Sequence, residues 1–263
     1  MKLRFLGTGT SFGVPVVGCD CATCTSPDPR DRRTRHGAVL QSDDGSRTLL
    51  IDAPPELRLQ LVRDGVHRVD AVWFTHAHAD HVHGIDDLRV FASRRSRPLP
   101  VYADAATAQH LRTRFDYIFD DSYEPPAGTS KPNLHLRTFE PFAPLRIAGF
   151  DMLPVEVPHG DQQVFGFRTG TLGYVTDAKR LDDRALAALQ GARVLVLNAL
   201  WHGNPHPTHF NVEEALEAAS RIGAERTWLT HLTHRVRHAV LVDSLPEGVA
   251  PAYDGLVVEI PDA

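Results

Sequence analysis

Three histidines and one aspartate stand within six consecutive positions and give the strongest chemical signal in the sequence. His76, His78, Asp80 and His81 follow the apolar run 71–74, which is predicted to be a buried strand. Imidazole nitrogens together with a carboxylate suit zinc, manganese, iron or nickel rather than calcium or magnesium. In an extended or turn conformation His76 and His78 point the same way, while Asp80 and His81 aim at a second point nearby. This loop is therefore predicted to serve two metal ions.

Three later segments repeat the pattern of an apolar run that ends in a metal-ligand residue. His159, Asp177 and His231 each follow a predicted strand. A lone histidine at a strand end is more often a surface or core residue, but together with the first loop these residues complete an open two-metal site. Asp177 has two carboxylate oxygens and is able to bridge the ions. The expected ligands are His76, His78 and His159 for one ion, and Asp80, His81 and His231 for the other.

All three cysteines of the chain lie within residues 19–24. Cys19, Cys21 and Cys24 offer three thiolates, whereas a tetrahedral structural zinc needs four ligands. His234 is the best candidate for the fourth ligand. An odd number of clustered cysteines favours metal binding over disulfides. The alternative is three reduced, buried cysteines with an exposed His234.

One further loop holds three histidines just before a predicted helix. His202, His206 and His209 precede Asn211, which is predicted to cap the helix 212–222. An anion is favoured next to a helix amino terminus. The residues alone do not decide which of the three histidines contacts a substrate.

The predicted elements that position these residues suggest two sheets with helices outside them. Strands are predicted at 2–6, 37–42, 47–53, 69–74, 98–102, 135–139, 145–148, 151–157, 164–169, 172–176, 194–197, 226–230 and 253–260. Helices are predicted at 54–65, 86–94, 105–119, 181–190 and 212–222. Each half of the chain is mostly strands followed by a helix, which fits a two-sheet core. The 263 residues are expected to form a single domain.

The charge balance limits the kinds of partner. With a net charge of −5, no basic excess draws the whole chain to nucleic acid or to an anionic membrane. A small anionic substrate is still compatible, because bound metals supply local positive charge. No apolar run approaches the ~20 residues that cross a bilayer, and the first residues lack the apolar core of a signal peptide. We expect a cytoplasmic protein without a membrane partner, and leave a homodimer open.

Taken together, these motifs resemble those of metallo-β-lactamase superfamily hydrolases. Within that superfamily the sequence most resembles the phosphoribosyl 1,2-cyclic phosphate phosphodiesterases of phosphonate breakdown. Besides the cysteine cluster and the histidine loop, the matching residues are Leu6-Gly7-Thr8-Gly9-Thr10, Ile51-Asp52-Ala53, Gly84, Val157-Pro158-His159, Thr176-Asp177, Thr230-His231-Leu232-Thr233-His234 and Tyr253-Asp254-Gly255. The resemblance implies an α/β (α+β) fold, the four-layered αβ/βα sandwich. It also implies two divalent transition-metal ions, zinc or manganese, and one structural zinc on the cysteines and His234.

The activity that this resemblance implies is hydrolysis of a small phosphodiester, with a cyclic ribosyl phosphate as one candidate. A hydroxide shared by the two metals would attack phosphorus. Asp80 and His209 are the expected catalytic residues, and the resemblance places His209 at the substrate phosphate near the leaving group. Alternatives are hydrolysis of a lactone, a thioester or an RNA phosphodiester, or a non-catalytic ligand or cofactor carrier. The chain lacks a long basic insertion that would grip RNA, so nucleic acid is not the expected partner.

Overall fold

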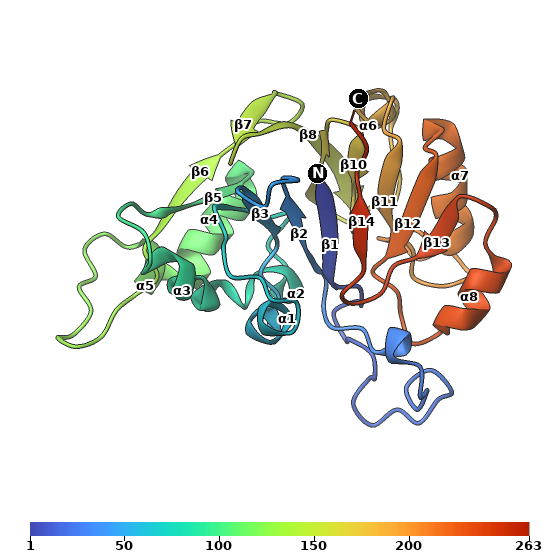
Figure 1. Cartoon of the computed structure of the whole chain (residues 1–263), viewed down its shortest axis with the longest axis horizontal. Helices are drawn as coiled ribbons and strands as arrows, with labels where there is room; N and C mark the ends of the chain where they lie inside the picture. Colours follow the sequence, from blue (N-terminus) through green and yellow to red (C-terminus); the bar gives the residue numbers. More distant parts are fainter. Residues whose placement is uncertain (263) are drawn as a thin grey trace.

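Two seven-stranded mixed sheets pack face to face in a computed structural model, which describes residues 1–262 (Figure 1). The first sheet has the order β14-β1-β2-β3-β4-β5-β6, and the second has the order β13-β12-β11-β10-β9-β8-β7. The first sheet consists of β1 (Lys2–Gly7), β2 (Gly37–Gln41), β3 (Thr48–Ile51), β4 (Ala71–Trp73), β5 (Leu99–Ala103), β6 (Leu134–Thr138) and β14 (Val257–Glu259). The second consists of β7 (Leu145–Ile147), β8 (Phe150–His159), β9 (Gln162–Thr169), β10 (Leu172–Tyr174), β11 (Val194–Asn198), β12 (Arg226–Thr230) and β13 (Val249–Pro251).

Helices cover the outer face of each sheet. The first sheet carries α1 (Leu57–Arg63), α2 (Ala79–Val82), η2 (Ile85–Leu88), α3 (Arg89–Ala92), α4 (Ala105–Arg114) and α5 (Asp116–Phe119). The second carries α6 (Asp183–Leu189), α7 (Val212–Ile222) and α8 (His238–Ser244). One apolar layer lies between the sheets and one lies under each group of helices. The four-layered αβ/βα sandwich predicted from the sequence is therefore confirmed.

The central strands are apolar throughout because both of their faces are covered. Successive side chains of a strand point to opposite faces of the sheet. Trp73 lies between the two sheets, whereas its neighbours Val72 and Phe74 lie under the helices. In β11, Val196 and Leu197 divide between the two layers in the same way. Such strands appear in the sequence as continuous apolar runs rather than as alternating ones.

The carboxyl ends of the parallel strands meet at one end of the molecule. β3 and β4 are parallel to each other, as are β10, β11 and β12. Backbone hydrogen bonds join the two sheets there, from Phe165 N to Thr75 O and from Leu232 N to Thr8 O, both at 2.9 Å. Segment 8–36, which contains η1 (Pro29–Asp31), projects beyond this end and is blue in Figure 1. Residues that follow these strands are thus brought together.

Several elements differ from the sequence-based prediction. Helix α8 and the short strand β13 were not predicted, and the helix expected over 105–119 is broken at Phe115. The helix expected at 86–94 consists of η2 and α3. Neither has a side-chain cap, so Asp86 and Asp87, at the start of the predicted range, do not cap a helix. None of the described helices is both long and apolar enough to cross a membrane. The single-domain assignment stays a prediction.

Candidate metal centre

The histidine loop ends in one turn of helix that is fixed to the neighbouring strand. His78 is the residue before α2, and Asp80 and His81 lie within this helix. The backbone of Ala53, just after β3, accepts a hydrogen bond from Gly84 N and donates one to His81 O, at 2.8 and 2.7 Å. A Cβ atom at Gly84 would lie 2.1 Å from Pro54 O, so only glycine permits this close approach. The helical turn that bears Asp80 and His81 is therefore fixed to the segment that follows β3.

Three strand-end residues of the site adopt a backbone conformation that is rare for residues other than glycine. Asp52, Asp177 and His231 have φ angles of 61°, 56° and 57°. These residues follow β3, β10 and β12. A left-handed conformation costs on the order of 1–3 kcal/mol at each residue and persists where the surrounding structure imposes it. Each of these three strands therefore turns sharply where its side chain enters the site.

Three imidazoles form the first group of potential metal ligands. His76 Nε2 and His78 Nδ1 are 3.0 Å apart, and a ring nitrogen of His159 lies within 4.8 Å of a nitrogen of each. His159 Nδ1 donates a hydrogen bond to Thr208 O at 3.0 Å. This bond engages Nδ1 and leaves His159 Nε2 as the ring nitrogen that is available to a metal. The structure thus brings together the three residues predicted for the first ion.

The carboxylate of Asp177 lies at the centre of the site. Its Oδ2 atom lies 3.5 Å from His81 Nε2, 3.4 Å from His231 Nε2, 3.2 Å from His209 Nε2 and 4.0 Å from His76 Nε2. Burial alone would raise the pKa of Asp177, but His231 and His81 beside it hold that pKa well below its usual value. Asp177 is therefore ionised and lies between the two predicted groups of ligands.

Residues predicted for the second ion meet around His81. Its Nε2 lies 3.5 Å from Asp80 Oδ2, and the His81 and His231 rings are stacked with centroids 5.9 Å apart. These three residues do not form a group with all donor atoms within 4.8 Å among the described residues, whereas His76, His81 and Asp177 do. The second group is therefore connected through Asp177. Metal ligation by these residues stays a prediction.

Asp52 orients His81, a role that sequence reasoning did not assign. His81 Nδ1 donates to Asp52 Oδ2 at 2.7 Å, and Thr75 donates to the same carboxylate from its backbone nitrogen at 2.8 Å and from its hydroxyl. The other ring nitrogen, His81 Nε2, is therefore directed into the site. This atom is fully buried and forms no hydrogen bond. A buried ring nitrogen without a hydrogen-bond partner fits a metal ligand. The surrounding set of imidazoles and carboxylates fits one as well.

His36 lies beneath the site and was not singled out in the sequence. Its ring is buried, 5.6 Å from the His81 ring and 6.0 Å from the His231 ring. It forms hydrogen bonds with the Tyr174 hydroxyl at 2.6 Å and the Thr230 hydroxyl at 3.3 Å. Burial lowers the pKa of His36 well below its usual value, so this ring is neutral. No nearby motif signals the contact, since these residues meet only in the folded chain.

The structure separates the three histidines of the loop before α7. His209 reaches the centre, with its ring 4.6 Å from that of His159 and its Nδ1 2.8 Å from the Thr208 hydroxyl. His206 lies one step outward, with its ring 5.1 Å from that of His209. His202 points elsewhere and contacts Glu213 at 2.9 Å. Of the three, His209 alone therefore borders the candidate ligands, and its contact with a substrate stays a prediction.

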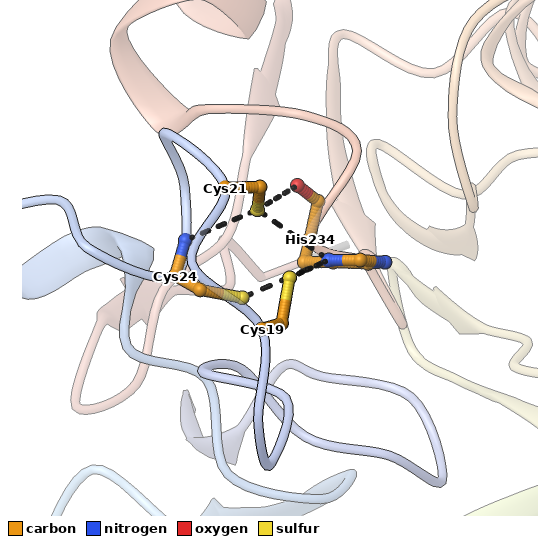
Figure 2. Close-up of side chains that lie close together, drawn as sticks. All are labelled: Cys19, Cys21, Cys24 and His234. Carbon is orange, nitrogen blue, oxygen red and sulfur yellow. Dashed lines mark hydrogen bonds between the residues drawn. The ribbon is translucent and has the colours of Figure 1, made fainter.

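The three cysteines and His234 converge on one point (Figure 2). His234 Nδ1 lies 3.3 Å from Cys19 Sγ, 3.5 Å from Cys21 Sγ and 3.7 Å from Cys24 Sγ. Three sulfur atoms and one nitrogen around a common centre are the donor set of a Cys₃His structural zinc site. The alternative of an exposed His234 apart from the cysteines does not fit this geometry.

Comparison with known proteins gives the family. The family model described as a beta-lactamase superfamily domain matches residues 47–232. A crystal structure of a diphosphatase from the PhnP family is 35% identical with a TM-score of 0.89, covering 99% of this chain and 98% of that one. Zinc-bound PqqB from Methylobacterium extorquens has a TM-score of 0.77 at 20% identity, covering 99% of this chain and 100% of that one, which shows the fold alone.

Two curated relatives are longer than this chain. The octanoyltransferase of Porphyromonas gingivalis is 36% identical over 257 residues, which are 97% of this chain and 51% of that protein. Coenzyme PQQ synthesis protein B of Methylorubrum populi is 28% identical over 156 residues, 49% of this chain and 50% of that protein. This chain thus spans about half the length of the octanoyltransferase, whereas about half of it matches about half of the PQQ synthesis protein. Since the family model covers most of the chain and the two-sheet fold agrees with it, this protein belongs to the beta-lactamase superfamily, with the metallo-β-lactamase fold.

Proposed function

We propose that this protein is a metal-dependent hydrolase that cleaves small phosphate diesters and the phosphoanhydride linkage of diphosphate esters. The observation that carries the proposal is the position of Asp177 Oδ2, within 4.0 Å of four imidazole nitrogens that come from three separate segments. The similarity to a PhnP-family diphosphatase supports chemistry at phosphorus. Phosphodiesters and diphosphates need the same step, in which water attacks phosphorus and an oxygen leaves.

The proposed metals are two divalent transition-metal ions such as zinc or manganese. When bound, they would activate a water molecule and neutralise charge that develops on the phosphoryl oxygens. The residues proposed to hold them are His76, His78, His159, Asp80, His81, His231 and Asp177. Asp52 keeps His81 in the tautomer that presents Nε2 to this centre.

His209 is proposed to protonate the leaving oxygen. The Asp177 carboxylate only accepts hydrogen bonds, so His209 Nε2, at 3.2 Å, carries a hydrogen atom. The ring is partly exposed, with 14% of its side-chain surface accessible, whereas the His76 and His81 rings beside it are buried. A substrate in the site can therefore reach the His209 proton, which makes this histidine a general acid.

The test is turnover by protein that has been stripped with a chelator and reloaded with manganese or zinc. We expect hydrolysis of bis(p-nitrophenyl) phosphate by the wild type and loss of that activity in Asp177→Ala, because the carboxylate joins the two ligand groups. Asp151→Ala is the matched control, since Asp151 is exposed and pairs only with the exposed Arg146. Full activity in Asp177→Ala contradicts the proposal. So does metal-loaded wild type that cleaves a lactone or a thioester but no phosphate diester.

A further inference from the structure

A groove outside the proposed two-metal centre is not used by the chemistry described above. It lies between loop 199–206 and segment 234–241, with a volume of about 590 Å³. Its lining includes Trp201, Asn204, Arg235, Arg237 and Val240. We call it the Trp201 groove. His234, the fourth residue of the cysteine cluster, also lines it. A metal held by that cluster would therefore fix the position of one side of the groove.

A continuous row of rings leads from the metal centre to this groove. His159, a proposed ligand, has its ring 4.6 Å from that of His209. The His209 ring is 5.1 Å from that of His206, and the His206 ring is 5.5 Å from that of Trp201. Each of the first three rings in this row therefore lies against the next one. Two ring contacts therefore separate His209 from Trp201, and they mark the direction in which a molecule held beside His209 would reach the groove.

The charge of the groove favours an anionic occupant. Arg235 and Arg237 line it, and among the described residues no aspartate or glutamate does. His202 also lines the groove but is engaged by Glu213, which lies outside the lining. Guanidinium groups bind phosphate oxygens in a bidentate manner. The whole chain has a net charge of −5, so the positive charge of this groove is opposite in sign to that of the molecule.

The shape of the groove favours a planar group. The Arg235 guanidinium lies 4.3 Å from the centroid of the Trp201 ring, and Trp201 Nε1 donates to Asn204 O at 2.8 Å, which fixes the indole. Val240 adds an apolar side chain that is 59% exposed. Nucleic-acid bases stack on indole and guanidinium planes. A flat, partly apolar ring joined to phosphate is the chemistry that matches both features.

We propose that the Trp201 groove binds the nucleoside part of a nucleoside diphosphate ester. This proposal rests on the proposed function, because the phosphorus of the same substrate would react at the metal centre. In that reaction the oxygen of water forms a new bond to one phosphorus, and the bond from that phosphorus to the bridging oxygen breaks, so the bridging oxygen leaves with the other phosphate. The products are a nucleoside monophosphate and a second phosphate monoester. His209 donates a proton to the leaving oxygen, and the protons of the attacking water pass to His209 and to the solvent. The groove selects this substrate class over small diesters that lack a base.

Binding of the product tests the groove without any turnover. AMP and ribose 5-phosphate carry the same phosphate, which binds the metal centre in both, and differ by the base. We expect metal-loaded wild type to bind AMP on the order of 10-fold or more tightly than ribose 5-phosphate in calorimetry. Arg235→Ala removes the stacked guanidinium and should abolish most of this preference. Arg184→Ala is the matched control, because Arg184 is an exposed arginine stacked 4.0 Å from the Phe142 ring, outside the groove.

Kinetics then compare two substrates. The ratio of kcat/KM for diadenosine diphosphate to kcat/KM for bis(p-nitrophenyl) phosphate should fall on the order of 10-fold in Arg235→Ala and stay constant in Arg184→Ala. Equal affinity of the wild type for AMP and ribose 5-phosphate overturns the groove proposal, as does an unchanged ratio in Arg235→Ala. Failure to cleave any phosphate diester overturns the proposed function instead, and the AMP comparison still decides whether the groove binds a nucleoside.

Discussion

Asp52 shows how a residue without direct access to a substrate shapes the site. Its carboxylate is fully buried and accepts hydrogen bonds from His81 Nδ1 and from Thr75. We expect Asp52→Asn to weaken binding of manganese or zinc to the centre by roughly 10- to 100-fold, the usual cost of losing a group that orients a histidine ligand. Titration of chelator-stripped protein with metal measures the affinity. An affinity equal to that of the wild type would show that Asp52 does not orient His81.

His209 makes a prediction that depends on the leaving group. A nitrophenolate leaves without a proton, whereas a sugar or alkyl alkoxide needs one. His209→Ala should therefore cost little with bis(p-nitrophenyl) phosphate but on the order of 10²–10⁴-fold in kcat with an alkyl or sugar diester. Steady-state kinetics on both substrates check this. Equal losses on both, seen largely in KM, would mean that His209 binds phosphate and donates no proton.

The residues that could be found from the sequence have a local signal. His76, His78, Asp80 and His81 stand together after one strand, and His159, Asp177 and His231 each follow another, so strand prediction was enough to find them. Asp52 and His36 lack such a signal. Asp52 acts through His81, 29 residues away, and His36 contacts Tyr174, 138 residues away. Their roles follow from strand pairing, which the sequence does not show.

At the scale of elements, segment 8–36 holds little regular structure and depends on polar anchors. Arg33 is buried and donates to Thr233 O and Val236 O at 2.7 and 2.9 Å, while it pairs with Asp31 at 3.0 Å. The cysteine cluster joins the same segment to His234. Both anchors fasten segment 8–36 to the loop after β12, which also bears His231. A metal on the cysteines would therefore support the centre indirectly.

Cys21→Ser should affect stability more than chemistry. A structural zinc contributes folding free energy, so this variant should lose about one zinc per chain and melt at a lower temperature. Asp177→Ala is the comparison, because it should abolish turnover while the protein stays folded. Elemental analysis and thermal unfolding give the two readouts. An unchanged zinc content together with an unchanged melting temperature in Cys21→Ser would refute a structural zinc.

Helix α8 carries a pH-dependent contribution to stability. Burial, with help from Arg30 and Arg33, lowers the pKa of His238 from 6.5 to about 4. The unfolded chain therefore binds a proton that the folded chain excludes between about pH 6.5 and 4, and stability falls as the pH is lowered through this range. The melting temperature of His238→Gln should fall less than that of the wild type as the pH is lowered over that range. The exposed His67→Gln serves as control, and a slope in His238→Gln equal to that of the wild type would contradict this assignment.

Elements with complete local signals were predicted closely. Helix α7 begins after Asn211, whose side chain accepts from Glu214 N while Glu214 accepts from Asn211 N, and it ends at the left-handed Gly223. Helix α8 lacks a side-chain cap and contains β-branched Val240 and Val242, so nothing in its sequence favoured a helix. Strand β13 has three residues and one of them is Pro251. Tertiary contacts, not propensity, produce these two elements.

For the molecule as a whole, metal binding and folding should be linked. The folded chain assembles ligands that are far apart in the unfolded chain, so metal binds the folded state preferentially. Stabilisation by a site reaches about 2.7 kcal/mol when free metal is 100 times its Kd. We expect chelator treatment to lower the melting temperature and remove activity, and added zinc or manganese to restore both. Intact activity in protein that contains no transition metal would refute the metal centre.

The layered architecture was the most predictable feature. Continuous apolar runs such as Val194–Leu197 require a cover on both faces of a strand, and strand-rich halves that each end in helices supply it. Strand order was less accessible from pattern alone. β14 pairs with β1, so residues from the two ends of the chain lie side by side in one sheet. Such pairing depends on contacts between residues more than 250 positions apart, which no local pattern encodes.

The same pairing of β1 with β14 has a consequence for modular assembly. The amino group of Met1 donates to Ile260 O at 3.3 Å, so both ends of the described chain emerge together. β1 runs from there to Thr8, which contacts Leu232 beside the metal centre, and the ends therefore lie opposite the site (Figure 1). A second module joined at either end would leave the face that bears the candidate metal centre open to solvent. A relative about twice as long as this chain, such as the octanoyltransferase, has room for a similar unit beside a second one.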